Sequence, residues 1–167
     1  MHPVASQLMV HYGMEPHPEG GYYLSTYRSE EMIQKEHLPA RYVGERHFSS
    51  AILYLLDGND FSSFHRLKSD EIWHFYSGSA LKIYVISPGG DLEVITLGSG
   101  FEYGETFQAV VRAGHWFAST PSDVNGYSLS GCTLSPGFDF YDFELADANE
   151  LSREFPQHQM LVRQFCR

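Results

Sequence analysis

Short runs of alternating apolar and polar residues, separated by turn-forming residues, make up most of the chain. Residues 80–86 and 91–97 both alternate in this way, and Ser87-Pro-Gly-Gly90 stands between them. A period of two is that of a strand with one buried face. Similar runs recur about every 10 residues, a spacing typical of an all-β sandwich or barrel. They lie at 22–28, 47–56, 61–67, 71–78, 108–112, 115–119 and 126–134.

The two ends of the chain carry helix signals instead. Residues 2–12 have apolar side chains at a period near that of a helix, begin with a proline and are followed by Gly13, which suits a helix end. Asp147 and Glu150 have the spacing of a capping box, and Pro156 ends the helical segment that they begin. These patterns predict a short helix at each end of the fold.

Two segments predict loops. Residues 29–45 are polar, charged and interrupted by a proline, so they predict a long surface loop. Residues 15–21 hold two prolines and two glycines and predict a second loop, which leads into the strand at 22–28. Glu19 in this second loop is a candidate for lining the mouth of a pocket, but a loop carboxylate is usually solvated, and we expect it to face water.

The composition supports one folded, β-rich domain spanning residues 1–167. Aromatic residues make up 15% of the chain, with eleven Tyr and twelve Phe, and fifteen Gly and eight Pro supply turns. Hydrophobic residues at 43% and charged residues at 19% lie in the globular range. A length of 167 residues fits one core, and no internal repeat or linker is visible.

Charge and hydropathy exclude two classes of partner. Eleven basic against twenty-one acidic residues leave a formal charge of −10, and such a field repels nucleic acid backbones. No apolar run approaches the ~20 residues that span a bilayer, and no signal peptide is visible at the N-terminus. Cys132 and Cys166 form no CxxC pair and are expected to be reduced. We therefore expect a cytoplasmic protein that binds neither nucleic acid nor membranes.

Residues 61–78 carry the candidate chemistry, because two strand-like halves meet there at a tight turn centred on Lys68. Pairing of the two halves would place His65 opposite Glu71, with their Cβ atoms roughly 5 Å apart. An imidazole and a carboxylate at that distance can share a metal ion, exchange a proton or form an ion pair. We predict that they lie inside a closed β container whose aromatic walls and few polar groups are typical of a small-molecule site.

Alternation along the strands indicates which other side chains face this pocket. Trp73 and Phe75 share a face with Glu71, and Ser63 shares one with His65. The predicted ligand-contacting residues are Ser63, Trp73, Phe75, Gln108, His115 and Phe117.

The spacing of His65, Glu71 and Gly78 is similar to the first cupin motif, G-x5-H-x-H-x3/4-E-x6-G. A more specific resemblance rests on His-Pro-Glu-Gly-Gly-Tyr at 17–22, the stretch 64–75, Trp-Phe-Ala at 116–118 and Pro-Gly-Phe-Asp-Phe at 136–140. In that order these stretches resemble a family of small cupins catalogued as a domain of unknown function, DUF985 or cupin 5. The resemblance implies a double-stranded β-helix, the jelly-roll barrel of cupins. The family has no settled activity to carry over.

The resemblance also implies where a cupin metal would bind, and here the chain departs from the pattern. Leu67 replaces the second His of the first motif, and Phe117 stands where the second motif, P-x-G-x2-H-x3-N, has its His. A typical cupin metal has three His and one Glu as ligands, so the loss of two removes most of the binding free energy. We predict no tightly bound cofactor. A divalent metal would need His65, Glu71 and His115 as its ligands.

The pairing of a carboxylate with an imidazole suggests a catalytic role. Such a carboxylate fixes the tautomer of the imidazole and raises its basicity, which suits His65 as a general base and Glu71 as its catalytic partner. This arrangement resembles metal-free cupins that epimerise nucleotide-linked sugars, a likeness of fold and residue type. The first hypothesis is therefore an isomerase or epimerase acting on a sugar-like or carbonyl compound.

Three alternatives to this enzyme stay open. The chain is also compatible with a non-catalytic cupin that binds a small ligand without changing it. A divalent-metal enzyme with non-standard ligands is the second alternative. In the third, His65 and Glu71 form a buried structural pair that needs no ligand.

An open strand edge predicts self-association. Residues 47–56 form the most strand-like run in the chain, and its edge would be left exposed in a monomer. Exposed edges pair readily with a second copy, so we expect a homodimer.

Overall fold

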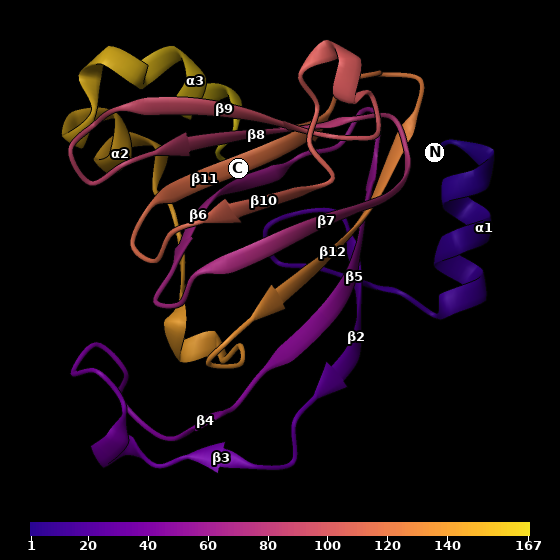
Figure 1. The fold of residues 1–167 in the computed structure, drawn as a ribbon. Helices are drawn as coiled ribbons and strands as arrows, with labels where there is room; N and C mark the ends of the chain where they lie inside the picture. Colours follow the sequence, from indigo (N-terminus) through magenta and orange to yellow (C-terminus); the bar gives the residue numbers. More distant parts are fainter.

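Two facing antiparallel sheets form the body of the molecule in the computed structural model, which describes residues 1–167 (Figure 1). The first sheet has the order β1 (Glu15–Pro16), β2 (Tyr22–Arg28), β5 (Ser50–Asp57), β12 (Tyr127–Leu134), β7 (Glu71–Gly78) and β10 (Gln108–Val111). The second has the order β13 (Phe143–Leu145), β6 (Ser62–Leu67), β11 (Trp116–Pro121), β8 (Leu81–Ile86) and β9 (Leu92–Leu97). This two-sheet jelly roll confirms the predicted all-β class.

Short helices flank the sheets at both ends, as predicted. Helix α1 (Pro3–Tyr12) ends at Gly13, whose left-handed backbone (φ 62°) lets its N–H donate to carbonyls of the preceding turn. Helix α2 (Ala148–Glu154) begins at Asp147, whose carboxylate accepts hydrogen bonds from two N–H groups of the first turn. Helix α3 (Gln159–Gln164) follows it. No helix of the fold has the length and apolar character needed to cross a membrane.

Residues 29–45 hold more regular structure than the predicted surface loop. They include β3 (Met32–Ile33), which pairs with β4 (Arg46–His47), and the 3-10 turn η1 (Lys35–His37). A strand of two residues has too few positions to show an alternation, so the sequence pattern does not reveal it. Figure 1 shows this β3–β4 arm extending below the two sheets. Other 3-10 turns are η2 (Phe101–Tyr103), η3 (Phe140–Asp142) and η4 (Pro156–His158).

The predicted pairing between the two halves of residues 61–78 is wrong. β6 pairs with β11 and β13, whereas β7 pairs with β10 and β12 in the other sheet. A tight hairpin turn uses residues with positive φ, and no residue other than glycine has one in this chain. The Lys68-Ser-Asp70 connection instead crosses between the sheets, and the Lys68 N–H donates to the Asp142 carbonyl. His65 and Glu71 therefore lie in different sheets.

The edge predicted at residues 47–56 is not exposed. β5 lies inside the first sheet, where it pairs with β2 on one side and β12 on the other. The strands at the sheet edges are β1, β10, β13 and β9. The reason given for a homodimer therefore does not hold, and the homodimer itself stays a prediction.

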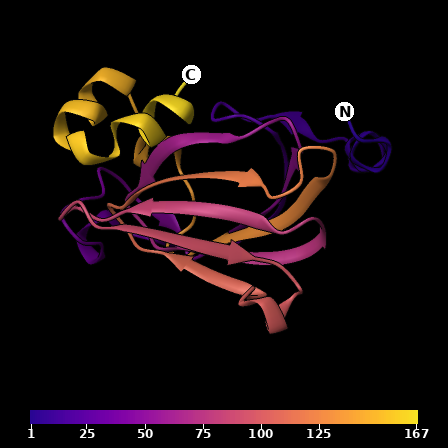
Figure 2. The same cartoon turned by 90° about the horizontal axis from the view of Figure 1, so that it is seen from above.

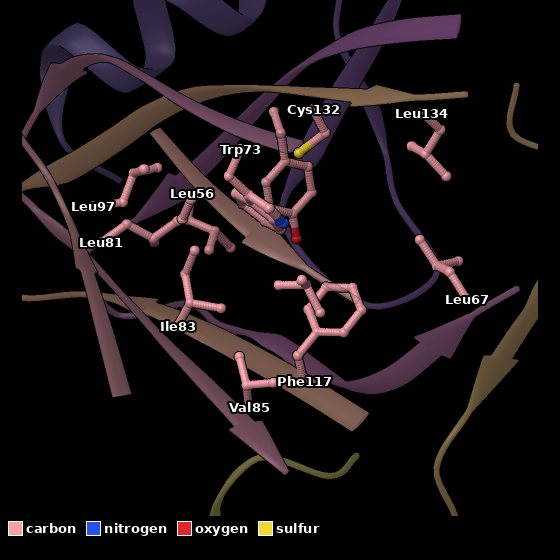
Figure 3. Packing of buried hydrophobic residues seen from close by; sticks show 13 residues of the cluster. Leu56, Leu67, Trp73, Leu81, Ile83, Val85, Leu97, Phe117, Cys132 and Leu134 are labelled. Carbon is pink, nitrogen blue, oxygen red and sulfur yellow. The ribbon is translucent and has the colours of Figure 1, made fainter. Parts of the chain in front are cut away.

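The space between the sheets holds the main core. Its largest fully buried side chains include Tyr54, Trp73 and Phe117, each 1% exposed. Burying a side chain of this size contributes about 1.5 to 3 kcal/mol to stability. Figure 3 shows leucine and isoleucine side chains crowded at one end of this core, whereas Leu67 and Leu134 lie apart from them.

A second cluster covers the second sheet. It joins Phe64 and Trp116 of the sheet to Phe155 and Val162 near the C-terminus. Figure 2 shows α2 and α3 together at one side of the sheets, with α1 at the opposite edge. The C-terminal helices thus bury the outer face of β6 and β11 and hold the strand that carries His65.

Candidate functional site

A cavity lies between the two sheets, beside Leu67 and Leu134. Its volume of about 50 Å³ holds a few non-hydrogen atoms, so it can enclose only the end of a larger compound. Both sheets and two connecting segments contribute to its wall. The lining residues are His17, Glu19, Tyr23, Ser50, Ile52, Tyr54, His65, Leu67, Glu71, Trp73, Cys132, Leu134, Phe138 and Phe143.

His65 and Glu19 lie in contact in the wall of this cavity. His65 Nε2 lies 3.0 Å from Glu19 Oε2, and both side chains are buried. His65 Nδ1 lies 2.8 Å from the Ser63 carbonyl oxygen, which can only accept, so Nδ1 carries the hydrogen. The Ser62 hydroxyl donates to the other carboxyl oxygen of Glu19 at 2.8 Å.

Burial disfavours charge on both of these side chains. It lowers the pKa of His65 from 6.5 to about 4, and the hydrogen bond to the Ser63 carbonyl opposes this by a smaller amount. Burial also raises the pKa of Glu19, an effect partly offset by the nearby His17 and by hydrogen bonds. Both shifts disfavour the charged form of the group concerned. The imidazole therefore stays uncharged at neutral pH.

Two glycines press the loop that carries Glu19 against the body. Gly20 and Gly21 have φ values of 116° and 68°, which glycine adopts at little cost. A Cβ on Gly20 would collide with the Phe61 carbonyl oxygen. The Glu19 carbonyl accepts a hydrogen bond from the Ser63 N–H at 2.8 Å. The side chain is only 5% exposed, so the expectation that Glu19 faces water is wrong.

Glu71 lines the cavity from the other sheet. Its side chain is buried at 7% exposure, and its Oε2 atom has no hydrogen-bond partner. Burial raises the pKa of Glu71 from 4.5 to about 8, and the neighbouring Glu19 carboxyl group adds to this. Trp73 and Cys132 lower the same pKa by a smaller amount. Glu71 is therefore protonated at neutral pH and can donate a hydrogen bond to a ligand.

The structure brings three of the predicted site residues together around the cavity. His65, Glu71 and Trp73 all line it. Phe117 lies behind His65, with ring centroids 4.0 Å apart, and holds the imidazole without lining the cavity. Ser63 also acts on His65, through its backbone carbonyl, while its buried hydroxyl lies outside the lining. These two residues support the imidazole from behind.

The remaining predicted contacts lie elsewhere. Gln108 pairs with His74 in the β10–β7 register, so it shares the outer face with that residue, and the two side chains are 3.0 Å apart. His115 lies beside the turn at Gly114, whose φ of 80° breaks the strand before β11 begins. Phe75 lies two residues after Trp73 on β7, and it packs against the core without lining the cavity. Strand parity alone therefore placed Gln108 and His115 wrongly.

Sequence reasoning missed the part that the N-terminal loop plays. His17 Nδ1 lies 3.5 Å from Glu19 Oε2, and burial lowers the pKa of His17. The Tyr54 hydroxyl donates to the Gly20 carbonyl at 2.7 Å and so ties the loop to β5. The signal was the Gly-Gly pair directly after an acidic residue, since consecutive glycines often mark a close approach of two backbones.

Two facing antiparallel sheets around a small buried cavity define a cupin-type protein. Residues 6–146 match the family described as the cupin superfamily, DUF985, and the chain belongs to this family. The match confirms the resemblance found in the motifs at 17–22, 64–75 and 136–140.

Solved structures agree with this assignment. A protein from Shewanella oneidensis is similar, with 39% identity and a TM-score of 0.88 over 98% of this chain and 97% of that one. A hypothetical protein from Leishmania major has 31% identity and a TM-score of 0.87 over 97% and 98% of the two chains. Oxalate decarboxylase from Bacillus subtilis shares the fold alone, with 11% identity and a TM-score of 0.54 over 90% of this chain and 36% of that one. No curated protein matches the chain.

The residues at the cupin metal positions do not fit a metal ion. Leu67 and Phe117 offer no donor atom, so two of the four ligand positions of a typical cupin metal are lost. No three His, Cys, Asp or Glu side chains are arranged to hold a metal. The substitute set of His65, Glu71 and His115 fails as well, because His115 lies outside the cavity.

We expect the purified protein to retain well under one metal ion per chain after growth with added manganese, iron, nickel or zinc. The physical reason is the donor set, in which two of four ligand positions are apolar. Elemental analysis by mass spectrometry checks this. One equivalent of any of these metals, lost in a His65→Ala variant, would contradict the expectation.

Proposed function

We propose that the chain binds the uncharged end of a small hydroxy or carbonyl compound in the cavity and isomerises it by proton transfer. The observation that carries this proposal is a pair of ionisable groups on facing walls whose pKa values are pushed in opposite directions. His65 titrates at about 4 and Glu71 at about 8, so at neutral pH one is an uncharged base and the other an uncharged acid.

The two walls suit an enolisation step. Glu71 donates its proton to the carbonyl oxygen while the proton on the neighbouring carbon passes to His65 Nε2. The substrate becomes a neutral enediol, Glu71 becomes a carboxylate, and His65 becomes an imidazolium. Return of the proton from His65 to the other carbon or the other face, together with return of an enediol hydroxyl proton to Glu71, gives an isomer or an epimer. The step leaves the net charge of the cavity unchanged, which limits the cost of charge in an apolar setting.

A non-catalytic binding protein is the second candidate. It is favoured by two buried polar atoms beside the cavity that have no partner, Glu71 Oε2 and the Trp73 indole Nε1. A ligand hydroxyl can both donate and accept, so it would satisfy both atoms without any chemistry. The aromatic residues around them supply faces on which an apolar edge of the ligand can stack.

A deuterium-exchange screen separates the two candidates. We expect the protein to exchange a carbon-bound proton of at least one small aldose, ketose or hydroxyketone in D₂O, as followed by NMR. His65→Gln is expected to slow this exchange by about 100-fold or more, since it removes the base. His115→Gln, a histidine outside the cavity, is the matched control and should leave the rate unchanged.

The outcomes decide between the candidates. Binding of a compound without any exchange supports the binding protein and contradicts the isomerase. An equal loss of exchange in His65→Gln and His115→Gln would show that the loss does not come from removal of the assigned base. Failure of every compound in the panel to bind would count against both candidates.

A further inference from the structure

A wider groove adjoins the cavity and carries positive charge. Its volume is about 680 Å³, against about 50 Å³ for the cavity, so it has room for the larger part of a compound whose end lies inside. Leu67 and Phe143 line both spaces, so the groove and the cavity lie next to each other. Arg41, Arg66 and Lys68 are also in its wall.

Two of the cations in and around the groove are already balanced. Arg46 makes two hydrogen bonds to the Asp142 carboxylate, at 2.6 and 2.7 Å. Arg66 makes two to the Glu144 carboxylate, at 2.7 and 3.0 Å. The acidic groups of the groove wall are therefore paired with a guanidinium each.

Arg41 and Lys68 remain without a carboxylate at hydrogen-bond distance. Arg41 uses only Nε, which donates to the Lys68 carbonyl at 2.7 Å and leaves its terminal nitrogens free. Lys68 Nζ donates to the Tyr141 carbonyl at 3.0 Å and lies 3.8 Å from Asp142, whose charge Arg46 already meets. The neighbouring Asp70 is paired with Arg112. The groove thus presents two positive charges in a chain whose net charge is −10.

We propose that this groove binds a phosphate group, carried by the compound whose uncharged end enters the cavity. Two adjacent cations match the two negative charges of a phosphate monoester, and a guanidinium and an ammonium supply the N–H donors that its oxygens accept. The cavity itself offers carboxyl groups and aromatic rings and no cation other than histidine, so an anion is excluded from it. The link to a substrate rests on the proposed function, whereas phosphate binding by the groove does not.

Titration with inorganic pyrophosphate at low ionic strength, followed by calorimetry, tests the groove directly. We expect saturable binding of one pyrophosphate per chain, weakened about tenfold or more by Arg41→Ala or Lys68→Ala, since each removes a charge-assisted contact. Lys82→Ala is the matched control, because Lys82 is exposed on β8 and outside the groove. Both groove variants should keep the wild-type melting temperature within a few degrees, because these side chains are on the surface.

His65→Gln and Glu71→Gln are expected to leave pyrophosphate affinity unchanged, which keeps this test separate from that of the isomerase. Absence of exchange activity in the wild type, together with intact pyrophosphate binding, would overturn the isomerase and leave phosphate binding by the groove in place. Absence of saturable binding would overturn the proposal that the groove binds phosphate. Equal weakening of pyrophosphate binding by Lys82→Ala and Lys68→Ala would overturn it as well.

Discussion

Replacing Asp142 by alanine is expected to lower the free energy of unfolding by about 3 to 5 kcal/mol. Arg46 and Asp142 form a buried pair, at 3% and 5% exposure, joined by two short hydrogen bonds. Removal of the carboxylate leaves a guanidinium charge buried without a partner, and the desolvation penalty is then no longer offset. The pair also ties β4 to η3, so its loss removes one of several contacts that hold the β3–β4 arm to the body.

Glu144→Ala is the matched control for this prediction. Glu144 also receives two hydrogen bonds from an arginine, Arg66, yet its side chain is 55% exposed. Water solvates the free guanidinium there, so the expected loss is below about 1 kcal/mol. Urea unfolding of the two variants compares the free energies directly. If Asp142→Ala loses no more free energy of unfolding than Glu144→Ala, burial of the Arg46–Asp142 pair adds nothing to the cost of breaking it.

Much of the fold was predictable because its signals are local. Alternation within six to eight residues located β5, β8, β9 and β12, and Asp147 marked the start of α2 by its own hydrogen bonds. The partner of each strand is not a local property. β6 and β7 are separated by three residues and still belong to different sheets, because the connection gains a bond to the Asp142 carbonyl instead of closing a hairpin. Pairing depends on such distant contacts.

The candidate site divides in the same way. Trp73 was found by parity on a strand whose inner face is marked by apolar residues. His65 and Glu71 were found from a hairpin pairing that is wrong and from their spacing in the cupin motif, yet both line the cavity. Glu19 was missed because its burial depends on a loop folding back over β6, which neither its own neighbours nor its charge indicates. Gln108 was misplaced because the inward position of β10 is Ala109, set by its register with Trp73. Alternation along a strand divides its residues between two faces, and only the register with the neighbouring strand decides which face points inward.

Glu71 connects the stability of the fold to the proposed chemistry. A buried carboxyl group with no hydrogen-bond partner on one oxygen adds nothing to packing that a glutamine of the same shape would not. Its ionisation is disfavoured by burial and by Glu19, so every charged state of this group costs stability. Proteins retain such costly groups chiefly where a ligand or a reaction uses them.

Glu71→Gln is therefore expected to make the protein more stable than the wild type at alkaline pH, by up to about 5 kcal/mol, from 1.36 kcal/mol per pH unit. The folded wild type holds the Glu71 proton up to a pKa of about 8, whereas the unfolded chain releases it near 4.5. Between these values the folded state binds more protons, so the stability of the wild type falls as pH rises and levels off above about 8. The glutamine variant has no such proton and escapes this decline.

Urea unfolding of both proteins between about pH 5 and 9 checks the prediction through their difference. His65 and Glu19 titrate in both proteins, so subtraction largely removes their contributions and leaves that of Glu71. Glu144→Gln, a change at an exposed carboxylate, should give a difference that does not vary over this range, because water solvates that side chain in the folded and unfolded states alike. A Glu71→Gln difference that is equally flat would mean that Glu71 ionises as it does in water. The acid that the proposed isomerisation requires would then be a carboxylate at neutral pH and unable to donate the proton.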